Sequence, residues 1–141
     1  MHYGYWVDGE KPTAQNFAQA QENHSNLIIN HVPKGIYNIL DVGSGSGNLA
    51  LKLINEGYVV DCVIPSEYLA DQIHQKLVNR SKIYVCGFEN MFTDEVYDLI
   101  LFSESFQYVN MVESLQKAVE MLKPGGYLLI CDFFRQNINK S

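Results

Sequence analysis

The hydrophobic residues of this chain fall into short, nearly continuous runs that alternate with longer segments of helical periodicity. Within each run, apolar and β-branched residues occupy most of a few consecutive positions, which is typical of a strand buried on both faces of a sheet. Five such strands are expected, over residues 36–42, 58–64, 81–86, 97–102 and 127–133.

Helices are predicted outside these runs, where apolar residues recur at three- and four-residue steps and so share one helix face. The first extends from Thr13 to His31, and the second covers about residues 48–56 before Gly57. The third follows Pro65-Ser66, and the fourth follows Asn110, which forms a capping-box pattern with Glu113. The inward stripe expected for the fourth helix consists of Val112, Leu115, Val119 and Leu122.

Strands that alternate with helices across short loops predict a parallel sheet with right-handed crossovers. We therefore expect a doubly wound α/β fold with about five parallel strands and flanking helices. All 141 residues are assigned to one domain, made of an N-terminal lid and helix (1–33), a core (34–134) and a polar tail (135–141). The lid is predicted from the aromatic opening His2-Tyr3-Gly4-Tyr5-Trp6, which is unusual for an exposed terminus.

Composition narrows the possible partners. The net charge is -6, and the ten basic residues are scattered, which argues against nucleic acid as a partner. The apolar runs are far shorter than the roughly 20 residues that span a bilayer. The three cysteines, Cys62, Cys86 and Cys131, are expected to be reduced core thiols, and with no visible secretory signal this favours a cytoplasmic location. No spacing of metal ligands is evident, so no metal is expected.

The first predicted strand runs directly into a glycine-rich loop, Asp41-Val42-Gly43-Ser44-Gly45-Ser46-Gly47, before a helix. Glycines permit a sharp turn and close approach of a ligand, and the helix start presents unpaired N–H groups, so this is a nucleotide-type binding loop. The third glycine comes one residue too early for a dinucleotide fingerprint, which has Asn48 at that position. Asp41 also has the wrong charge for a pyrophosphate, whereas it suits a ligand with an ammonium group.

Three motifs together resemble the class I S-adenosylmethionine-dependent methyltransferases, which have a Rossmann-like fold. The loop from Asp41 to Gly47 matches the family's acidic-x-G-x-G-x-G pattern at every fixed position. The strand Tyr97-Asp98-Leu99-Ile100-Leu101-Phe102 is similar to the family's fourth strand, and Leu122-Lys123-Pro124-Gly125-Gly126 to the turn before its fifth. The resemblance covers about residues 13–134, and the aromatic opening is similar to that of members acting on small molecules.

The resemblance implies roles for particular residues in binding S-adenosyl-L-methionine and its product, S-adenosyl-L-homocysteine. Asp41 would hold the amino group, directly or through water. The family normally offers an acid to the ribose after the second strand, but here Ile64 and Pro65 stand at that strand's end, and the nearest acids are Asp61 and Glu67. The loop residues that would pass under the methionine part are Gly43, Ser44, Gly45 and Gly47.

The loops after the third and fourth strands would complete the site. Phe88 would stack on the adenine, and Glu89 would accept a hydrogen bond from its amino group. Ser103 begins the loop that faces both cofactor and substrate, in which Glu104 is a candidate base or substrate anchor and Tyr108 a weaker catalytic candidate. A solvated or loop-capping Glu104 and a core Tyr108 are the competing interpretations.

The function predicted from this resemblance is methyl transfer to a small-molecule acceptor. A non-catalytic methyltransferase-like binding or accessory protein is the main alternative, favoured by the absent ribose acid and the missing C-terminal strands. An NAD-linked oxidoreductase is disfavoured by the glycine spacing. Family members continue past the fifth strand with a helix and an antiparallel strand pair. We therefore expect a truncated chain, a homodimer or a partner chain that covers the edge of the fifth strand.

Overall fold

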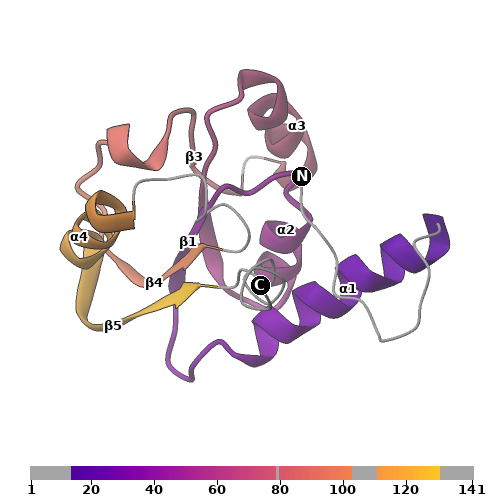
Figure 1. The fold of residues 1–141 in the computed structure, drawn as a ribbon, viewed down its shortest axis with the longest axis horizontal. Helices are drawn as coiled ribbons and strands as arrows, with labels where there is room; N and C mark the ends of the chain where they lie inside the picture. Colours follow the sequence, from indigo (N-terminus) through magenta and orange to yellow (C-terminus); the bar gives the residue numbers. More distant parts are fainter. Residues whose placement is uncertain (1–13, 79, 103–110, 131–141) are drawn as a thin grey trace, which may run out of the picture.

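The computed structural model describes residues 14–78, 80–102 and 111–130. Helices and strands alternate along the chain, as Figure 1 shows. The elements are α1 (Ala14–Asn30), β1 (Asn38–Val42), α2 (Asn48–Asn55), β2 (Val59–Val63), α3 (Glu67–Leu77), β3 (Ile83–Tyr84), the 3-10 turn η1 (Phe88–Asn90), β4 (Tyr97–Phe102), α4 (Met111–Met121) and β5 (Leu122–Ile130).

The described strands form one parallel sheet of five strands in the order β3-β2-β1-β4-β5. The first strand, β1, lies in the middle of the sheet, and β2 and β3 follow on one side of it. The chain then crosses back, so that β4 and β5 lie on the other side of β1. The strand order therefore reverses between β1 and β4, as in a doubly wound fold. The predicted fold class is confirmed.

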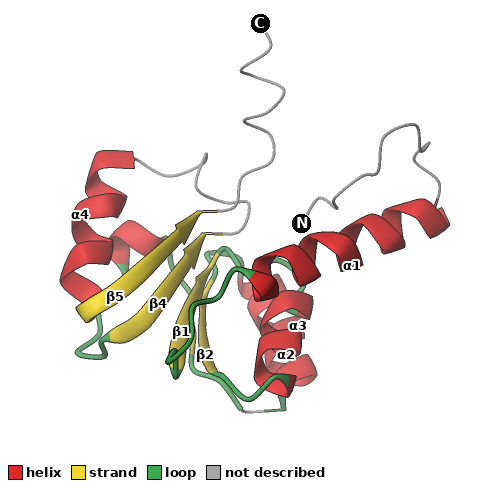
Figure 2. Ribbon diagram, turned by 90° about the horizontal axis from the view of Figure 1, so that it is seen from below, coloured by secondary structure: helices red, strands yellow, loops and turns green. Residues whose placement is uncertain are grey.

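Helices cover both faces of this sheet (Figure 2). On one face, α1, α2 and α3 bury residues that include Ile28, Leu53 and Ile73 against the odd positions of β1, such as Ile39. On the opposite face, α4 and η1 pack against the even positions, with Leu40 among them. Successive side chains of a strand point to opposite faces, so the apolar runs of β1 and β4 serve two cores at once.

Local signals explain where the helices begin and end. Ser66 Oγ accepts a hydrogen bond from Leu69 N at 3.2 Å and caps α3, as the Pro65-Ser66 pair predicted. At the other end of α3, Val78 adopts a left-handed conformation (φ 51°) that stops the helix. Gly47, at φ 84°, is the N-cap of α2 and makes no side-chain cap.

Two expectations for the C-terminal part were wrong in detail. Leu115 packs against the core as expected, but Val112 and Val119 are 65% and 67% exposed, and Ser114, Ala118 and Met121 are buried instead. The expected stripe was therefore wrong at both valines. Leu122 belongs to β5, not to the helix, and pairs with Tyr97.

The predicted turn from Leu122 to Gly126 is an irregularity within β5, not a segment preceding it. The register shifts between Tyr97 and Leu99, which pair with Leu122 and Tyr127. Gly125 has φ 79°, which absorbs the extra residues. β3 is also shorter than expected, with Ile83 and Tyr84 alone in the ladder.

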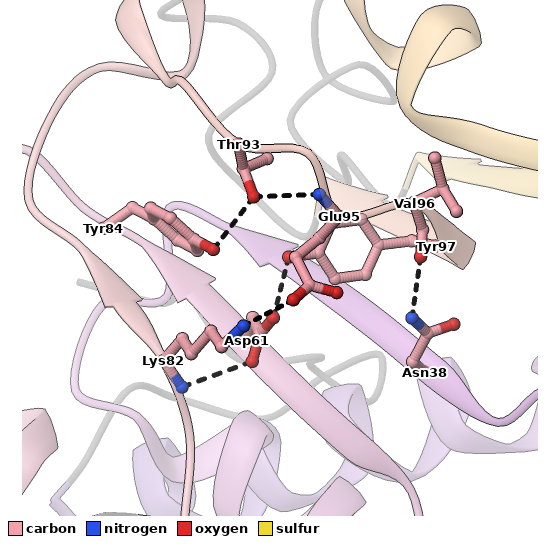
Figure 3. Close-up of polar contacts among 8 residues, drawn as sticks. All are labelled: Asn38, Asp61, Lys82, Tyr84, Thr93, Glu95, Val96 and Tyr97. Carbon is pink, nitrogen blue, oxygen red and sulfur yellow. Dashed lines mark hydrogen bonds and ion pairs between the residues drawn. The ribbon is translucent and has the colours of Figure 1, made fainter.

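A buried polar network joins β2, β3 and β4 on the face covered by α4 (Figure 3). Asp61, which is 8% exposed, accepts hydrogen bonds from Tyr97 Oη at 2.7 Å and Lys82 N at 3.2 Å. Burial and the bond to Asp61 raise the pKa of Tyr97 far above its usual value, so the phenol stays protonated. Tyr84 Oη pairs with Thr93 Oγ1 at 3.1 Å. The network attaches the two-residue strand β3 to the sheet.

A second polar contact joins the start of β1 to β4, at the amino ends of the parallel strands. Asp98 Oδ2 accepts hydrogen bonds from Asn38 N at 3.1 Å and Tyr37 N at 2.8 Å, and Lys123 lies 3.5 Å from its Oδ1. These backbone donors, aided by Lys123, lower the pKa of the Asp98 carboxyl. The ionised form is therefore favoured by folding.

Replacing Asp98 by asparagine should lower the melting temperature at neutral pH and leave it unchanged in strong acid. A lowered folded pKa stabilises the protein above the unfolded carboxyl pKa, about 3.9, and this stabilisation is lost as the pH falls through the folded value. Melting curves of both proteins between pH 2 and 7 test this. A difference between them that stays constant over the whole range would show that the charge of Asp98 is irrelevant.

Both described cysteines, Cys62 and Cys86, are free. In the part of the chain that the structure describes, no helix is both long enough and apolar enough to cross a bilayer. β5 forms one edge of the described sheet, and its covering by a second copy or a partner chain stays a prediction.

Candidate functional site

The candidate site lies at the carboxyl ends of the parallel strands, where the order reverses. Val42 pairs with Val63 of β2 and with Phe102 of β4, so these three strands end at the same level. Gly43 N donates to Val63 O at 2.8 Å, which holds the start of the glycine loop against the end of β2. The loops after β1 and β2 therefore leave the sheet side by side.

Three glycines of this loop adopt left-handed conformations, with φ 75° at Gly43, 59° at Gly45 and 84° at Gly47. Other residues adopt this region only at a cost, so the glycine pattern reflects the backbone path itself. Gly47 N donates to Ser44 O at 3.0 Å and closes a tight turn, and Leu51 N donates to Gly47 O at 2.9 Å. The loop thus passes directly into α2.

Asp41 is the acidic residue of the site and is fully buried. It lies on the face of β1 that α1, α2 and α3 cover, and it pairs with Cys62 of β2. Ser44 Oγ donates to the Asp41 carbonyl oxygen at 3.0 Å, which ties the loop back to β1. A carboxylate held away from water interacts strongly with a cation that reaches it, because solvent screening there is weak.

Cys62 lies next to Asp41 beneath the loop. Burial, together with the negative charge of Asp41, raises the pKa of the Cys62 thiol to about 12, although a hydrogen bond with Ser44 opposes the shift. The thiol is therefore protonated at neutral pH and adds no charge to the site. It packs as a small apolar residue between β2 and the helices on this face.

The other cofactor residues predicted from sequence lie on neighbouring elements. Ile64 is 3% exposed at the end of β2, and its N–H donates to Tyr84 O at 2.9 Å. Phe88 is 2% exposed and packs edge-to-face on Phe102, with ring centroids 5.3 Å apart. Its ring is part of the core under η1, so its stacking on adenine stays a prediction that this packing does not favour.

Glu89 is exposed and lies beside the backbone of Gly87. A Cβ added to Gly87 would come within 2.5 Å of Glu89 Oε1, so the carboxylate occupies the space that a side chain at Gly87 would need. Its predicted contact with adenine stays a prediction. Ser103, Glu104 and Tyr108 lie outside the described residues.

The two acids nearest to the expected ribose position differ in their availability. Asp61 points to the face covered by α4, and both of its carboxylate oxygens already accept hydrogen bonds. Glu67 is exposed in the first turn of α3. Asp61 is thus a structural residue, in agreement with its early position in the strand.

Lys76 was missed by the sequence reasoning. From α3 its ammonium donates to Ser46 O at 2.9 Å and to Asn48 Oδ1 at 2.5 Å, which brings a cation to the back of the glycine loop. It lies 30 residues from Ser46 in sequence and looks like any other polar residue on a helix. Only the packing of α3 against the loop reveals the contact.

Comparisons with known proteins agree with this geometry. A family model described as "Methyltransferase domain" matches residues 40–130, which include the glycine loop and β5. An uncharacterized methyltransferase of Mycobacterium tuberculosis (strain ATCC 25618 / H37Rv) is 25% identical over 97 residues, covering 69% of this chain and 40% of the relative. A putative methyltransferase of Geobacillus sp. (strain WCH70) is 28% identical, covering 90% of this chain and 54% of the relative.

Among solved structures, the geranyl diphosphate C-methyltransferase from Streptomyces coelicolor A3(2) superposes with a TM-score of 0.79. It is 18% identical, and the match covers 92% of this chain and 55% of the Streptomyces enzyme, whose structure contains Mg²⁺, geranyl diphosphate and S-adenosyl-L-homocysteine. This likeness concerns the fold. The chain spans about half the length, or less, of the proteins it matches. The family match extends over most of the chain, and together with the strand-end glycine loop it shows that the chain belongs to the methyltransferase domain family.

Proposed function

We propose that this chain binds S-adenosyl-L-methionine at the glycine loop and transfers its methyl group to a small-molecule acceptor. The single observation that carries the proposal is the pairing of a buried carboxylate, Asp41, with a left-handed glycine loop at the point where the strand order reverses. The membership of the methyltransferase domain family supports it.

The residues of the loop fit the methionine part of such a cofactor. Gly47 lies against α3 so closely that an added Cβ would come within 3.1 Å of Ile73 Cγ1. Packing therefore excludes a side chain at Gly47, and since Gly43 and Gly45 have none, the loop offers bare backbone on which a ligand can rest. Asp41 supplies the negative charge that an amino group requires. A pyrophosphate would be repelled by the same carboxylate, which disfavours a nicotinamide dinucleotide.

When bound, the cofactor supplies a sulfonium methyl group that is attacked in line with the departing sulfur. Because the sulfonium is an intrinsically good leaving group, the work of the protein is to orient the two reactants and exclude water. Asp41 and the glycine loop would orient the methionine part. The predicted base or anchor, Glu104, would hold the acceptor, with Tyr108 as the weaker candidate.

A non-catalytic binding protein of the same family is the second candidate. The observation that favours it is the lack of an available acid for the ribose among the described residues at the end of β2. Asp61 is already hydrogen-bonded on the face of the sheet that α4 covers, and Ile64 and Pro65 follow the strand. Ribose recognition would then depend on Glu67 or on residues outside the described ranges. The enzyme requires the cofactor to bind, whereas the non-catalytic protein does not.

Calorimetric titration of the full chain with S-adenosyl-L-methionine is the first test of the enzyme. We expect saturable binding in the micromolar range, and tighter binding than that of NAD. The absence of binding at millimolar concentration would overturn the enzyme and leave the non-catalytic protein. If the cofactor binds, formation of S-adenosyl-L-homocysteine in the presence of a panel of small acceptors distinguishes the enzyme from the binding protein.

A further inference from the structure

A cationic side chain of α3, that of Lys76, is hydrogen-bonded to the glycine loop. Lys76 is half-buried in the last turn of α3, and its ammonium donates to the carbonyl oxygen of Ser46, in the middle of the loop, at 2.9 Å. The same ammonium donates to Asn48 Oδ1 at 2.5 Å, at the first residue of α2. Both acceptors are neutral, and they flank Gly47, the residue where the loop becomes a helix.

The same helix also supports Gly47 from behind. Ile73 lies one turn before Lys76 on α3, is fully buried, and would meet a Cβ on Gly47 at 3.1 Å. The contact with Ile73 limits where the loop can move, whereas the bonds from Lys76 fix which way its peptide planes face. The two residues therefore act on the same three-residue stretch.

The hydrogen bond from Lys76 to the Ser46 carbonyl restrains the peptide between Ser46 and Gly47. Glycine in the left-handed region has more accessible backbone conformations than any other residue, and ordering it costs conformational entropy. Asn48 N lies 3.4 Å from Ser46 Oγ, a long and therefore weak contact. The ammonium of Lys76 is a stronger restraint, because hydrogen bonds from a charged donor are worth about twice as much as neutral ones.

A cation near the end of a helix usually interacts with the last carbonyls of its own helix. Lys76 does not follow this pattern, because both of its described acceptors belong to the loop and to α2. Its long side chain spans the gap between α3 and the loop. Ordering this side chain costs conformational entropy, which the two hydrogen bonds offset.

We propose that Lys76 is a positioning residue that holds the Ser46 carbonyl toward α3 and so keeps the glycine loop in the conformation that receives the cofactor. This inference rests on the proposed function for its ligand and on the contacts above for its geometry. Lys76 acts through the loop and does not itself contact the cofactor. Its effect is on preorganisation, since a loop that is ordered before binding loses less entropy when the ligand arrives.

The first test is calorimetric titration with S-adenosyl-L-methionine of the full chain and of three variants. Lys76→Met keeps the length of the side chain and removes the donor, and we expect its affinity to fall about 5- to 10-fold with a less favourable binding entropy. Lys76→Arg, which can still donate to both acceptors, should recover most of the affinity. Lys34→Met is the matched control, because it removes the same charge from an exposed position and should leave the affinity unchanged.

The second test needs no ligand. Hydrogen exchange of the Gly47 and Leu51 amides should be faster in Lys76→Met than in the wild type, while exchange in β1 and β4 stays the same. Unchanged exchange at both amides would overturn the inference, as would faster exchange with unchanged cofactor affinity. If the wild-type chain fails to bind the cofactor, the proposed function is wrong, and the exchange experiment still decides whether Lys76 holds the loop.

Discussion

Replacing Asp41 by asparagine is expected to lower the affinity for S-adenosyl-L-methionine by about 10- to 100-fold while the protein stays folded. The substitution preserves the shape of the side chain and removes its charge, so a charge-assisted hydrogen bond to the cofactor's amino group becomes a neutral one. A hydrogen bond to a charged group contributes about 1.5 to 3 kcal/mol and a neutral one about 0.5 to 1.5 kcal/mol, and the weakly screened attraction between carboxylate and ammonium is lost as well. Each 1.4 kcal/mol corresponds to a factor of about ten in affinity. Calorimetric titration at a temperature well below the melting point measures the effect.

The matched control is Asp61→Asn on the neighbouring strand. Asp61 is also a buried acid, but it points to the opposite face of the sheet and accepts hydrogen bonds from Tyr97 and Lys82 N. We expect this variant to melt at a lower temperature and to bind the cofactor normally. Equal losses of affinity in both variants would show that buried charge in general matters, and that Asp41 has no specific contact with the ligand.

The architecture was predictable because several independent signals agreed. Apolar runs of strand length, helical periodicity between them and short loops leave few alternatives to a parallel doubly wound sheet. Residues 97–102 illustrate this, since β4 has the bounds that the hydrophobic run gave. Ser66 shows the same for helix starts, because a local hydrogen bond to Leu69 decides the boundary of α3.

The C-terminal part was harder to predict, for reasons of tertiary packing. In α4 the buried positions include Ser114 and Ala118, whereas Val112 and Val119 are exposed, so hydrophobicity alone assigned both valines to the wrong side of the helix. β5 begins before its glycines, because the ladder with β4 tolerates an irregularity that contains Gly125. A pairing made across the sheet left no local signal in the sequence.

The features of the candidate site also differ in whether the sequence revealed them. The glycine loop and Asp41 were visible because their chemistry is local and their spacing is distinctive. The position of Phe88 beside the ligand stays a prediction, and the packing of its ring on Phe102 depends on two segments distant in sequence. The contact of Lys76 with the glycine loop was not visible in the sequence, since only the position of α3 brings this lysine to Ser46.

Four contacts from three elements now account for the conformation of the loop. The end of β2 holds Gly43, the carbonyl of Asp41 in β1 accepts from Ser44, and α3 supplies Lys76 and Ile73. A loop restrained from several sides gains rigidity from each contact, and it also becomes sensitive to any added atom. An added methyl group at Gly47 tests this sensitivity.

Changing Gly47 to alanine should destabilise the protein by about 2 to 5 kcal/mol and strongly weaken cofactor binding. The left-handed conformation, with φ 84°, costs a non-glycine residue roughly 1 to 2 kcal/mol. The new Cβ would also lie 3.1 Å from Ile73 Cγ1, in a buried contact where overpacking adds about 1 to 3 kcal/mol. Thermal melting should show a decrease of roughly 10 °C, and titration with S-adenosyl-L-methionine should show the loss of affinity.

Gly35→Ala separates these two causes. Gly35 has nearly the same conformation, with φ 87°, but an added Cβ there has no neighbour within 4 Å. Alanine at Gly35 should therefore cost only the backbone strain, about 1 to 2 kcal/mol, and leave cofactor binding intact. If the two variants lose the same stability, the contact with Ile73 contributes nothing. If Gly47→Ala retains full affinity, the glycine loop does not form the cofactor site, and the ligand must bind elsewhere on the strand ends.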